Sequence, residues 1–342
     1  MKVGVYYRNS DVRVEERPVP ATSDDDILVK VMACGLCGSD LLEWYRIKRA
    51  PLVLGHELAG EIVEAGKRVE RFRPGDRVFA THHVPCDECH ECRTGHETAC
   101  RVFQTVNNFD PGGFSQYVRV SGRSLKTGTF VLPREVTFEQ GAFVEPLGTA
   151  VRALRTLDLR PAQSLLVCGS GIAGLLMVKL ARALGAGNVI ATDTSAQRLE
   201  KAKEYGASHG ISAGEDIPAF VRSVNDGRLA DKVAICVGSV PAAQSALQSA
   251  ERGGTVLFFA VPRPDETLAI DFNPLWRDDM TIKTCYGAAP VDNVQALELI
   301  RRGTVVVSDM ITHRFRIEQI GDAFAVGGRP DDCLKVLVLP NG

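Results

Sequence analysis

Apolar and polar positions divide the 342-residue chain into two kinds of sequence. In roughly the first 145 residues, runs such as DILVKVMA (26–33), GEIVEA (60–65) and FSQYVRV (114–120) alternate in polarity and stop at Gly, Pro or Asp. Short alternating runs bounded by turn-forming residues are typical of half-buried β-strands. This region is therefore predicted to be a β-rich domain.

From about residue 146 the pattern changes to short apolar runs separated by helical segments. Fully apolar runs of this length suit strands of a parallel sheet that is buried on both faces. Strand and helix in alternation predict an α/β fold with a doubly wound parallel sheet. The predicted strands are 164–168, 188–193, 232–238, 255–261 and 281–287, with helices over 241–254 and 292–302.

Composition places the chain among ordinary globular proteins. Apolar residues make up 45 %, charged residues 24 %, and the net charge is −2, so nothing favours nucleic acid or an anionic membrane as a partner. No apolar run reaches the ~18 residues of a membrane span, and the N-terminus lacks the apolar stretch of a signal peptide. We expect a cytoplasmic protein, in which the ten cysteines serve as metal ligands or core residues rather than disulfides.

Four cysteines are crowded into one short segment. Cys86, Cys89, Cys92 and Cys100 follow the spacing C-x2-C-x2-C-x7-C. Two-residue gaps let neighbouring thiolates converge on one ion, and four sulfur ligands suit tetrahedral zinc with no open position. A disulfide pair fits the compartment poorly, and iron–sulfur proteins use other spacings. The segment predicts a structural zinc site.

A second group of residues could hold a metal with an open position. Cys37, His56, Glu57 and Glu145 offer a thiolate, an imidazole and carboxylates, and three such ligands leave room for water or substrate. Singly, each has a plainer explanation as a buried cysteine, a loop histidine or a solvated acid. Glycines at 55, 60 and 66 indicate a tight turn entering a bent strand, which favours the metal site.

Several motifs together resemble the zinc-containing medium-chain dehydrogenase/reductase family, the group of alcohol, sorbitol and threonine dehydrogenases. The matching segments occur in the family's order from about residue 30 to about 205; they are CGSD (37–40), GHELAGEIVEAGKRV (55–69), PGDRV (74–78), the cysteine segment, GGFSQY (112–117) and the glycine motif described below.

The resemblance implies an overall organisation. A GroES-like catalytic domain would comprise residues 1–145, with the structural-zinc lobe at about 85–101, and would be completed by residues 290–342. A Rossmann domain that binds NAD would be inserted as residues 146–289.

The resemblance also implies ligand roles. Cys37 and His56 would be catalytic zinc ligands, and Glu57 would be a ligand or would exchange with water. Glu145 stands where alcohol dehydrogenases have a second cysteine and polyol dehydrogenases have Glu, so the pattern is closest to the polyol, sorbitol-type enzymes. The family carries two zinc ions per chain, one catalytic and one structural.

The segment around residue 170 carries a dinucleotide-binding fingerprint. Gly169-x-Gly171-x-x-Gly174 follows a predicted strand and opens a predicted helix, so the backbone can approach a pyrophosphate at the helix N-terminus. Asp193 ends the next strand and would bind the adenosine ribose, which favours NAD over NADP, although Arg198 could serve a 2′-phosphate. The predicted cofactor-binding residues are Gly169, Gly171, Ile172, Ala173, Gly174, Asp193 and Arg198.

These features predict a dehydrogenase that transfers hydride between NAD(H) and a secondary alcohol or ketone of a polyol, sugar or cyclitol. Ser39 would accept or relay the substrate's proton. In many relatives the fifth residue after the zinc cysteine is a histidine that passes this proton on, but here it is Leu42. The alternatives are an amino-alcohol oxidoreductase of the threonine dehydrogenase type, a ketone reductase, or an inactive protein that binds zinc and nucleotide. Relatives are mostly dimers or tetramers, so a homo-oligomer is expected.

Overall fold

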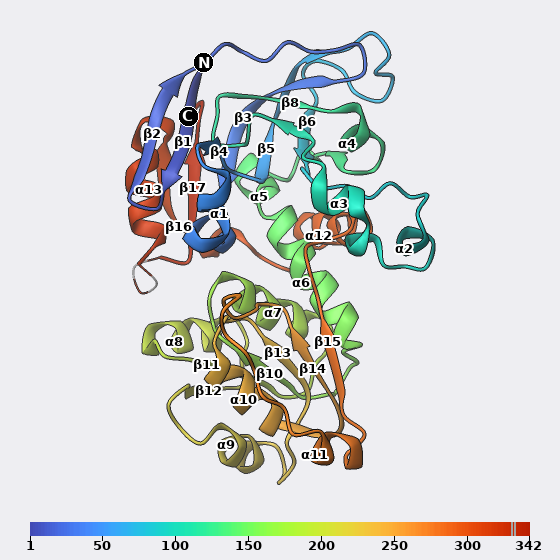
Figure 1. Cartoon of the computed structure of the whole chain (residues 1–342), viewed down its shortest axis with the longest axis vertical. Helices are drawn as coiled ribbons and strands as arrows, with labels where there is room; N and C mark the ends of the chain where they lie inside the picture. Colours follow the sequence, from blue (N-terminus) through green and yellow to red (C-terminus); the bar gives the residue numbers. More distant parts are fainter. Residues whose placement is uncertain (330, 332) are drawn as a thin grey trace. The chain divides into compact units, whose positions relative to one another are not determined.

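The computed structural model describes residues 1–329, 331 and 333–342, and this part of the chain forms two compact units (Figure 1). The first unit combines residues 1–148 with residues 288–342, and the second contains residues 149–287. In the sequence, the second unit is therefore inserted into the first.

The first unit is built on β-strands. Its larger sheet has the order β16-β17-β3-β5-β6-β9, with β8 paired to β3 and to β7, and a smaller sheet has the order β2-β1-β4. The strands are β1 (Lys2–Arg8), β2 (Asp11–Glu16), β3 (Ile27–Gly35), β4 (Leu52–Val53), β5 (Glu57–Ala65), β6 (Arg77–Ala80), β7 (Phe109–Asp110), β8 (Tyr117–Val120), β9 (Thr129–Val131), β16 (Ile311–Arg316) and β17 (Lys335–Leu339).

Short helices connect these strands. The longer helices are α6, which contains the boundary between the two units, and α12, which begins where the chain returns to the first unit. The α-helices are α1 (Glu43–Arg46), α2 (His90–Arg93), α3 (Arg101–Thr105), α4 (Gly122–Thr127), α5 (Phe138–Gly141), α6 (Val144–Leu157), α12 (Pro290–Arg301) and α13 (Ile320–Gly327). Single 3-10 turns cover Gly38–Leu41, Ile47–Arg49, Glu97–Ala99, Ser308–Met310 and Ile317–Gln319.

Strand β3 lies at the centre of the first unit because it pairs with three neighbours, β5, β8 and β17. Most of its residues are buried, and they pack with apolar side chains such as Tyr6, Leu58 and Phe114 in one continuous core. Burial of this apolar surface is the main force that holds the strands together. The end of β3 therefore has a firmly supported position.

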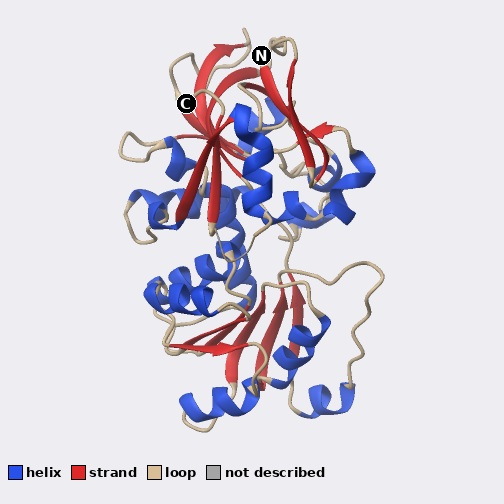
Figure 2. Cartoon of the chain, turned by 90° about the vertical axis from the view of Figure 1, so that its left-hand side faces the viewer, coloured by secondary structure: helices blue, strands red, loops and turns tan. Residues whose placement is uncertain are grey.

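The second unit is the predicted doubly wound parallel sheet. All its strand pairs are parallel, the order is β12-β11-β10-β13-β14-β15, and helices lie on both sides (Figure 2). The strands are β10 (Leu165–Cys168), β11 (Val189–Asp193), β12 (His209–Ser212), β13 (Ala230–Ile235), β14 (Ala250–Phe258) and β15 (Thr281–Thr284), and the helices are α7 (Ile172–Ala183), α8 (Ala196–Glu204), α9 (Ile217–Val224), α10 (Val240–Gln248) and α11 (Phe272–Arg277).

One predicted helix is shorter than its sequence suggests. The segment 241–254 was expected to be helical throughout, but α10 ends at Gln248 and β14 begins at Ala250. Ala250 pairs with Ala230, and a register shift separates this pair from the next one. The polar, glycine-containing start of β14 gains its strand geometry from this pairing, which the local pattern does not show.

Within the described residues, no helix is long and apolar enough to cross a bilayer.

Candidate active site

Strand register brings Cys37 and His56 together. In the antiparallel β3–β5 pair, Gly35 lies opposite Glu57. Cys37 comes two residues after the end of β3, and His56 comes one residue before the start of β5. Both residues therefore lie at the same end of this strand pair, although 18 other residues separate them in the sequence.

One ligand atom from each of Cys37, His56 and Glu57 lies within 4.8 Å of the others. A thiolate, an imidazole and a carboxylate are zinc ligands, and three of them leave a fourth position open. The donor set therefore fits the catalytic zinc that the sequence predicts. Glu145, at the start of α6, lies outside this group of three in the described part of the chain.

Glu57 forms a buried ion pair with Lys335 from β17. The Lys335 ammonium donates to the Glu57 carboxylate and, at 3.2 Å, to the carbonyl oxygen of Leu36, and both side chains are almost fully buried. Burial lowers the pKa of Lys335, but the charges of Glu57 and Cys37 outweigh burial and leave that pKa raised. The pair places a fixed positive charge next to the three-residue group.

Asp40 supports the imidazole of His56 at Nδ1. Its carboxylate lies 3.5 Å from Nδ1 of His56 and accepts a hydrogen bond from the backbone N–H of Cys37 at 3.2 Å. A proton held on Nδ1 leaves Nε2 of the imidazole free to bind a metal, which is the usual arrangement around metal-binding histidines. Burial lowers the pKa of His56, but the charges of Asp40 and Cys37 raise it well above its usual value.

Glu145 is half-buried at the N-terminal end of α6. Burial and the charge of Glu57 raise its pKa to about 7, although the His56 charge opposes the shift. A carboxyl group with a pKa near neutrality can hold or release a proton under physiological conditions. Glu145 thus remains a candidate for a role in proton movement or as an alternative ligand.

Ser39 lies directly beside the thiol of Cys37. Its hydroxyl donates to the Cys37 sulfur at 3.4 Å and accepts a hydrogen bond from Arg46 at 2.9 Å. Leu42, which stands in place of the histidine found in many relatives, has 42 % of its surface exposed. Its side chain has no polar atom that could continue a proton path from Ser39.

Two further histidines border the group and were not singled out in the sequence. The ring centre of His82 lies 5.0 Å from that of His56, and the ring centre of His83 lies 3.7 Å from that of His82. Burial lowers the pKa of His82 well below its usual value and lowers the pKa of His83 to about 4. Both are therefore neutral near pH 7. The doubled histidine after β6 was the only sequence signal for them.

The four cysteines of the lobe converge as their spacing predicts. The sulfur atoms of Cys86, Cys89, Cys92 and Cys100 lie within 4.8 Å of one another, with individual separations of 3.4, 3.6 and 4.0 Å. Four thiolates around one zinc ion at ~2.3 Å would be about 3.8 Å apart. Cys86, Cys89, Cys92 and Cys100 are all free thiols rather than disulfides. The cluster fits a closed zinc site.

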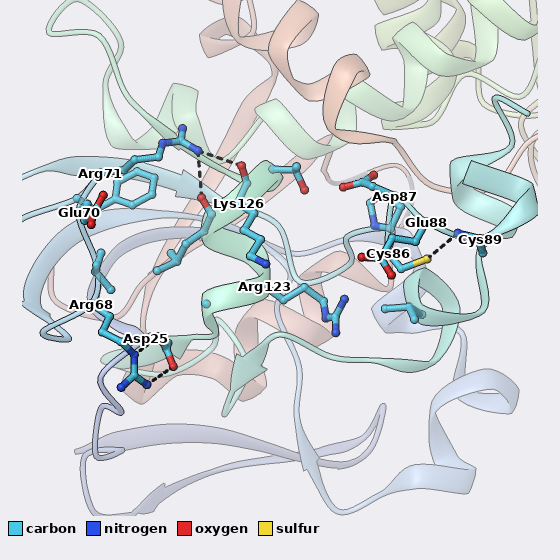
Figure 3. A pocket seen from close by; sticks show the side chains of 17 residues that line it. Asp25, Arg68, Glu70, Arg71, Cys86, Asp87, Glu88, Cys89, Arg123 and Lys126 are labelled. Carbon is cyan, nitrogen blue, oxygen red and sulfur yellow. Dashed lines mark hydrogen bonds and ion pairs between the residues drawn. The ribbon is translucent and has the colours of Figure 1, made fainter. Parts of the chain in front are cut away.

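A cavity of about 1150 Å³ lies beside this lobe and is lined by charged side chains of both signs (Figure 3). Arg68 and Asp25 form an ion pair across one part of it, while Cys86 and Cys89 border another. Cys37, His56 and Glu57 are not among its lining residues. This cavity is therefore separate from the candidate active site.

The glycine motif in the second unit has the geometry of a phosphate-binding turn. Gly169 has φ +99°, and a Cβ atom at Gly174 would lie 2.0 Å from the Gly169 carbonyl oxygen, so both positions require glycine. A Cβ atom at Gly171 would meet only Arg198, at 3.8 Å. Ile172 and Ala173 begin α7, whose free N–H groups favour an anion.

Asp193 ends β11 next to this turn. Its carboxylate accepts hydrogen bonds from the backbone N–H of Ser170 at 2.7 Å and of Ser195 at 2.9 Å. Arg198 lies 4.0 Å from the same carboxylate. A carboxylate has about four acceptor positions, so two remain available for ribose hydroxyls.

Comparison with known proteins now identifies the family. Residues 23–127 match the model of the alcohol dehydrogenase GroES-like domain, and residues 173–302 match that of the zinc-binding dehydrogenases. Sorbitol dehydrogenase of Bacillus subtilis (strain 168) is 33 % identical over 352 residues, covering 100 % of this chain and 98 % of the relative. The chain belongs to the zinc-containing medium-chain dehydrogenase/reductase family. It is an enzyme of the alcohol and polyol dehydrogenase type, with the predicted GroES-like and Rossmann folds.

Solved structures of this family share the whole fold. Alcohol dehydrogenase TADH from Thermus sp. ATN1 has a TM-score of 0.89 at 27 % identity, with 99 % of both chains covered. A zinc-binding dehydrogenase from Sinorhizobium meliloti 1021 bound to NADP has a TM-score of 0.88 at 28 % identity, again with 99 % of both chains covered. These matches support zinc and a nicotinamide dinucleotide as cofactors of this chain.

Proposed function

We propose that this enzyme transfers hydride between NAD(H) and a secondary alcohol or ketone of a polyol, sugar or cyclitol. The observation that carries the proposal is the convergence of Cys37, His56 and Glu57, with Ser39 beside them, in a chain whose relatives include sorbitol dehydrogenases from Bacillus subtilis and Mus musculus. Cys37 and His56 would hold the catalytic zinc, with Glu57 or Glu145 as a third ligand, and Cys86, Cys89, Cys92 and Cys100 would hold the structural zinc.

The chemistry explains why such a site needs a metal. The pKa of a substrate hydroxyl is near that of water, about 9 units above the pKa of an imidazole. Proton transfer from the hydroxyl to an imidazole would therefore be unfavourable by ~12 kcal/mol. Zinc bound at this site would supply a Lewis acid that lowers the pKa of a bound hydroxyl towards 7. The hydroxyl oxygen of Ser39 would accept a hydrogen bond from the substrate hydroxyl. Glu57, paired with Lys335, would keep the charge of the site balanced.

A substrate panel tests this function. The zinc-loaded protein is mixed with NAD and with sorbitol, xylitol, galactitol, myo-inositol or threonine, and formation of NADH is followed by absorbance. We expect turnover of at least one polyol or cyclitol. Turnover of threonine alone would instead indicate the amino-alcohol function. Binding of NADH without any turnover, in either direction, would indicate a protein that has lost catalysis.

Two cysteine variants separate the metal site from general damage. Cys37→Ser should lose one zinc ion per chain and all turnover while retaining NADH binding. Cys285→Ser makes the same chemical change in the second unit and should retain both zinc ions and activity. Equal activity of the two variants would contradict the ligand role of Cys37.

We infer that NAD is preferred to NADP because Asp193 lies beside the glycine turn with a charge that repels a 2′-phosphate. Asp193→Asn keeps a hydrogen-bond acceptor but removes the charge, so the ratio of kcat/KM for NAD to that for NADP should fall at least ~10-fold, equivalent to 1.4 kcal/mol. Arg198→Ala should raise the same ratio. An unchanged ratio in Asp193→Asn would contradict the ribose contact.

We also propose that the protein acts as a homo-oligomer in the cytoplasm, where the thiols of the cysteine lobe remain reduced. Strand β15 is at the end of the sheet order and is largely exposed, and nearby α11 carries Phe272 and Trp276 with 68 % and 80 % of their surfaces exposed. Edge strands and large exposed apolar side chains are features that a second copy of the chain would cover.

A further inference from the structure

Arg46 turns back onto the loop that follows Cys37. Its Nε donates to the carbonyl oxygen of Ser39 at 3.0 Å, and its Nη2 donates to the Ser39 hydroxyl at 2.9 Å and to the Asp40 carboxylate at 3.3 Å. Only 15 % of the side chain is exposed, and the guanidinium lies 4.7 Å from the ring centre of Tyr45. A single side chain is thus bonded to Ser39, which contacts Cys37, and to Asp40, which lies beside His56.

The neighbouring basic residues behave differently. Lys48 and Arg49 belong to the same basic stretch, but both are exposed to solvent. Ordering a long side chain such as Arg costs up to ~2 kcal/mol of rotamer entropy. The three hydrogen bonds of Arg46 offset this loss of rotamer entropy. An arginine that acts only as a surface charge stays mobile and loses no such entropy.

These bonds restrict the orientation of the Ser39 hydroxyl. A hydroxyl has one donor hydrogen and two acceptor positions. Arg46 occupies one acceptor position, and because a guanidinium only donates, the hydroxyl hydrogen must point elsewhere. The Cys37 sulfur, 3.4 Å away, is the partner that the structure provides for this hydrogen. One acceptor position of Ser39 then remains for a substrate hydroxyl.

We propose that Arg46 is a positioning residue that orients the Ser39 hydroxyl towards the substrate. This inference rests on the proposed function. It assigns a role that Leu42 cannot fill, because the Leu42 side chain has no polar atom with which to orient Ser39. Arg46 does not itself accept the substrate's proton, since a guanidinium stays protonated in proteins.

A double-mutant cycle tests whether Arg46 acts through Ser39. Ser39→Ala, Arg46→Ala and the double variant are compared with the parent, using a polyol that the parent oxidises. Each single variant should lower kcat ~10- to 100-fold with a smaller change in KM, within the range of acid–base contributions. The double variant should be no slower than Ser39→Ala. Multiplicative losses would overturn the proposal, because Arg46 would then act independently of Ser39.

Chemical rescue and metal content test whether the role of Arg46 is merely structural. Added guanidinium ion should restore part of the kcat of Arg46→Ala but not that of the double variant, and ammonium should restore less. Zinc content should stay at the parent's value in every variant. Loss of zinc from Arg46→Ala would overturn the proposal by showing that Arg46 acts through Asp40 and His56. Arg49→Ala removes an equal, exposed charge and should keep the parent's kcat.

Hydrogen–deuterium exchange of the zinc-loaded protein gives a readout that does not depend on turnover. Arg46→Ala should speed exchange in the segment 38–46, whereas Arg49→Ala should leave that segment unchanged. Equal exchange in Arg46→Ala and the parent would overturn the ordering of Ser39 by Arg46. If the parent turns over no member of the substrate panel, the proposed function fails, and the exchange measurement still decides separately whether Arg46 orders this loop.

Discussion

At the scale of single residues, the tightest steric constraint in the candidate site falls on Gly35. A Cβ atom at this position would lie 1.9 Å from the Glu57 carboxylate and 2.8 Å from the Lys335 side chain. The buried ion pair with Lys335 holds the Glu57 carboxylate in place, so displacing the carboxylate would weaken that pair. The absence of a side chain at Gly35 therefore fixes where Glu57 lies.

Gly35→Ala should displace the Glu57 carboxylate and weaken the catalytic metal site. We expect a loss of ~1–3 kcal/mol of stability from overpacking, together with lower zinc content at this site. Gly38→Ala is the matched control, because a Cβ atom there meets nothing within 4 Å. Thermal melting and elemental analysis of both variants measure the difference, and equal behaviour would contradict the constraint.

His83 should make the protein sensitive to mild acid. Its pKa is lowered to about 4 in the folded state by burial, whereas an unfolded histidine titrates near 6.5. Between these values the unfolded chain binds a proton that the folded chain does not, so stability falls as the pH decreases from 6.5 to 4. The full contribution is at most ~3 kcal/mol.

His83→Phe should therefore reduce the drop in melting temperature between pH 7 and pH 5, because it keeps an aromatic ring against Phe103 and removes the titrating group. His90→Gln changes an exposed histidine and should leave the drop unchanged. An identical pH dependence of His83→Phe and the parent would show that His83 is not buried in its neutral form.

The candidate metal ligands could be predicted from sequence, but the residues that support them could not. Cys37 and His56 carry the chemistry in short motifs with flanking glycines. Lys335 reaches Glu57 only because β17 pairs with β3 in a particular register, over a separation that no local pattern encodes. No motif marks Arg46 in the sequence, and only the folded loop shows that its guanidinium is turned inward.

At the scale of elements, the cysteine lobe contains little regular structure that could hold it together. Its helices, α2 and α3, are each less than two turns long, and short helices are not stable alone. Convergence of the four thiols therefore supplies the main constraint on the segment. The spacing of the cysteines predicted that the four thiols converge, because ligand geometry is local in the sequence.

Cys89→Ser should release the structural zinc and leave the catalytic zinc in place. We expect one zinc ion per chain, a lower melting temperature and faster proteolysis within residues 85–101, because binding of a structural metal contributes directly to folding. Cys285→Ser again provides the control. Melting of Cys89→Ser at the parent's temperature would contradict a stabilising metal in the lobe.

At the scale of the whole molecule, the fold class of each unit could be predicted from the sequence more accurately than the first and last residues of its strands. The glycine fingerprint and the repeated apolar runs led to the parallel sheet, whose order matches that of dinucleotide-binding folds. Strand β14 starts earlier than predicted because pairing with β13 determines its beginning. The pattern of buried strands also cannot show which sheet edge remains exposed.

The exposed edge predicts how copies of the chain assemble. Trp276→Glu places a charge among the exposed apolar side chains of α11 and should shift the protein to a smaller assembly. Light scattering after size-exclusion chromatography measures the mass. Leu184→Glu adds the same charge to another exposed apolar position in the second unit and should leave the mass unchanged. An unchanged mass for Trp276→Glu would exclude this surface from the interface.

The ion pair between Glu57 and Lys335 joins residues 278 positions apart, with the whole second unit between them in the chain. During synthesis on the ribosome, Glu57 is therefore made long before its counter-ion exists. Until β17 emerges and pairs with β3, burial of the Glu57 carboxylate would be strongly unfavourable because its counter-ion Lys335 is missing. Nascent chains should consequently fill the cysteine lobe with metal early and acquire the catalytic ion only after β17 has emerged and paired with β3.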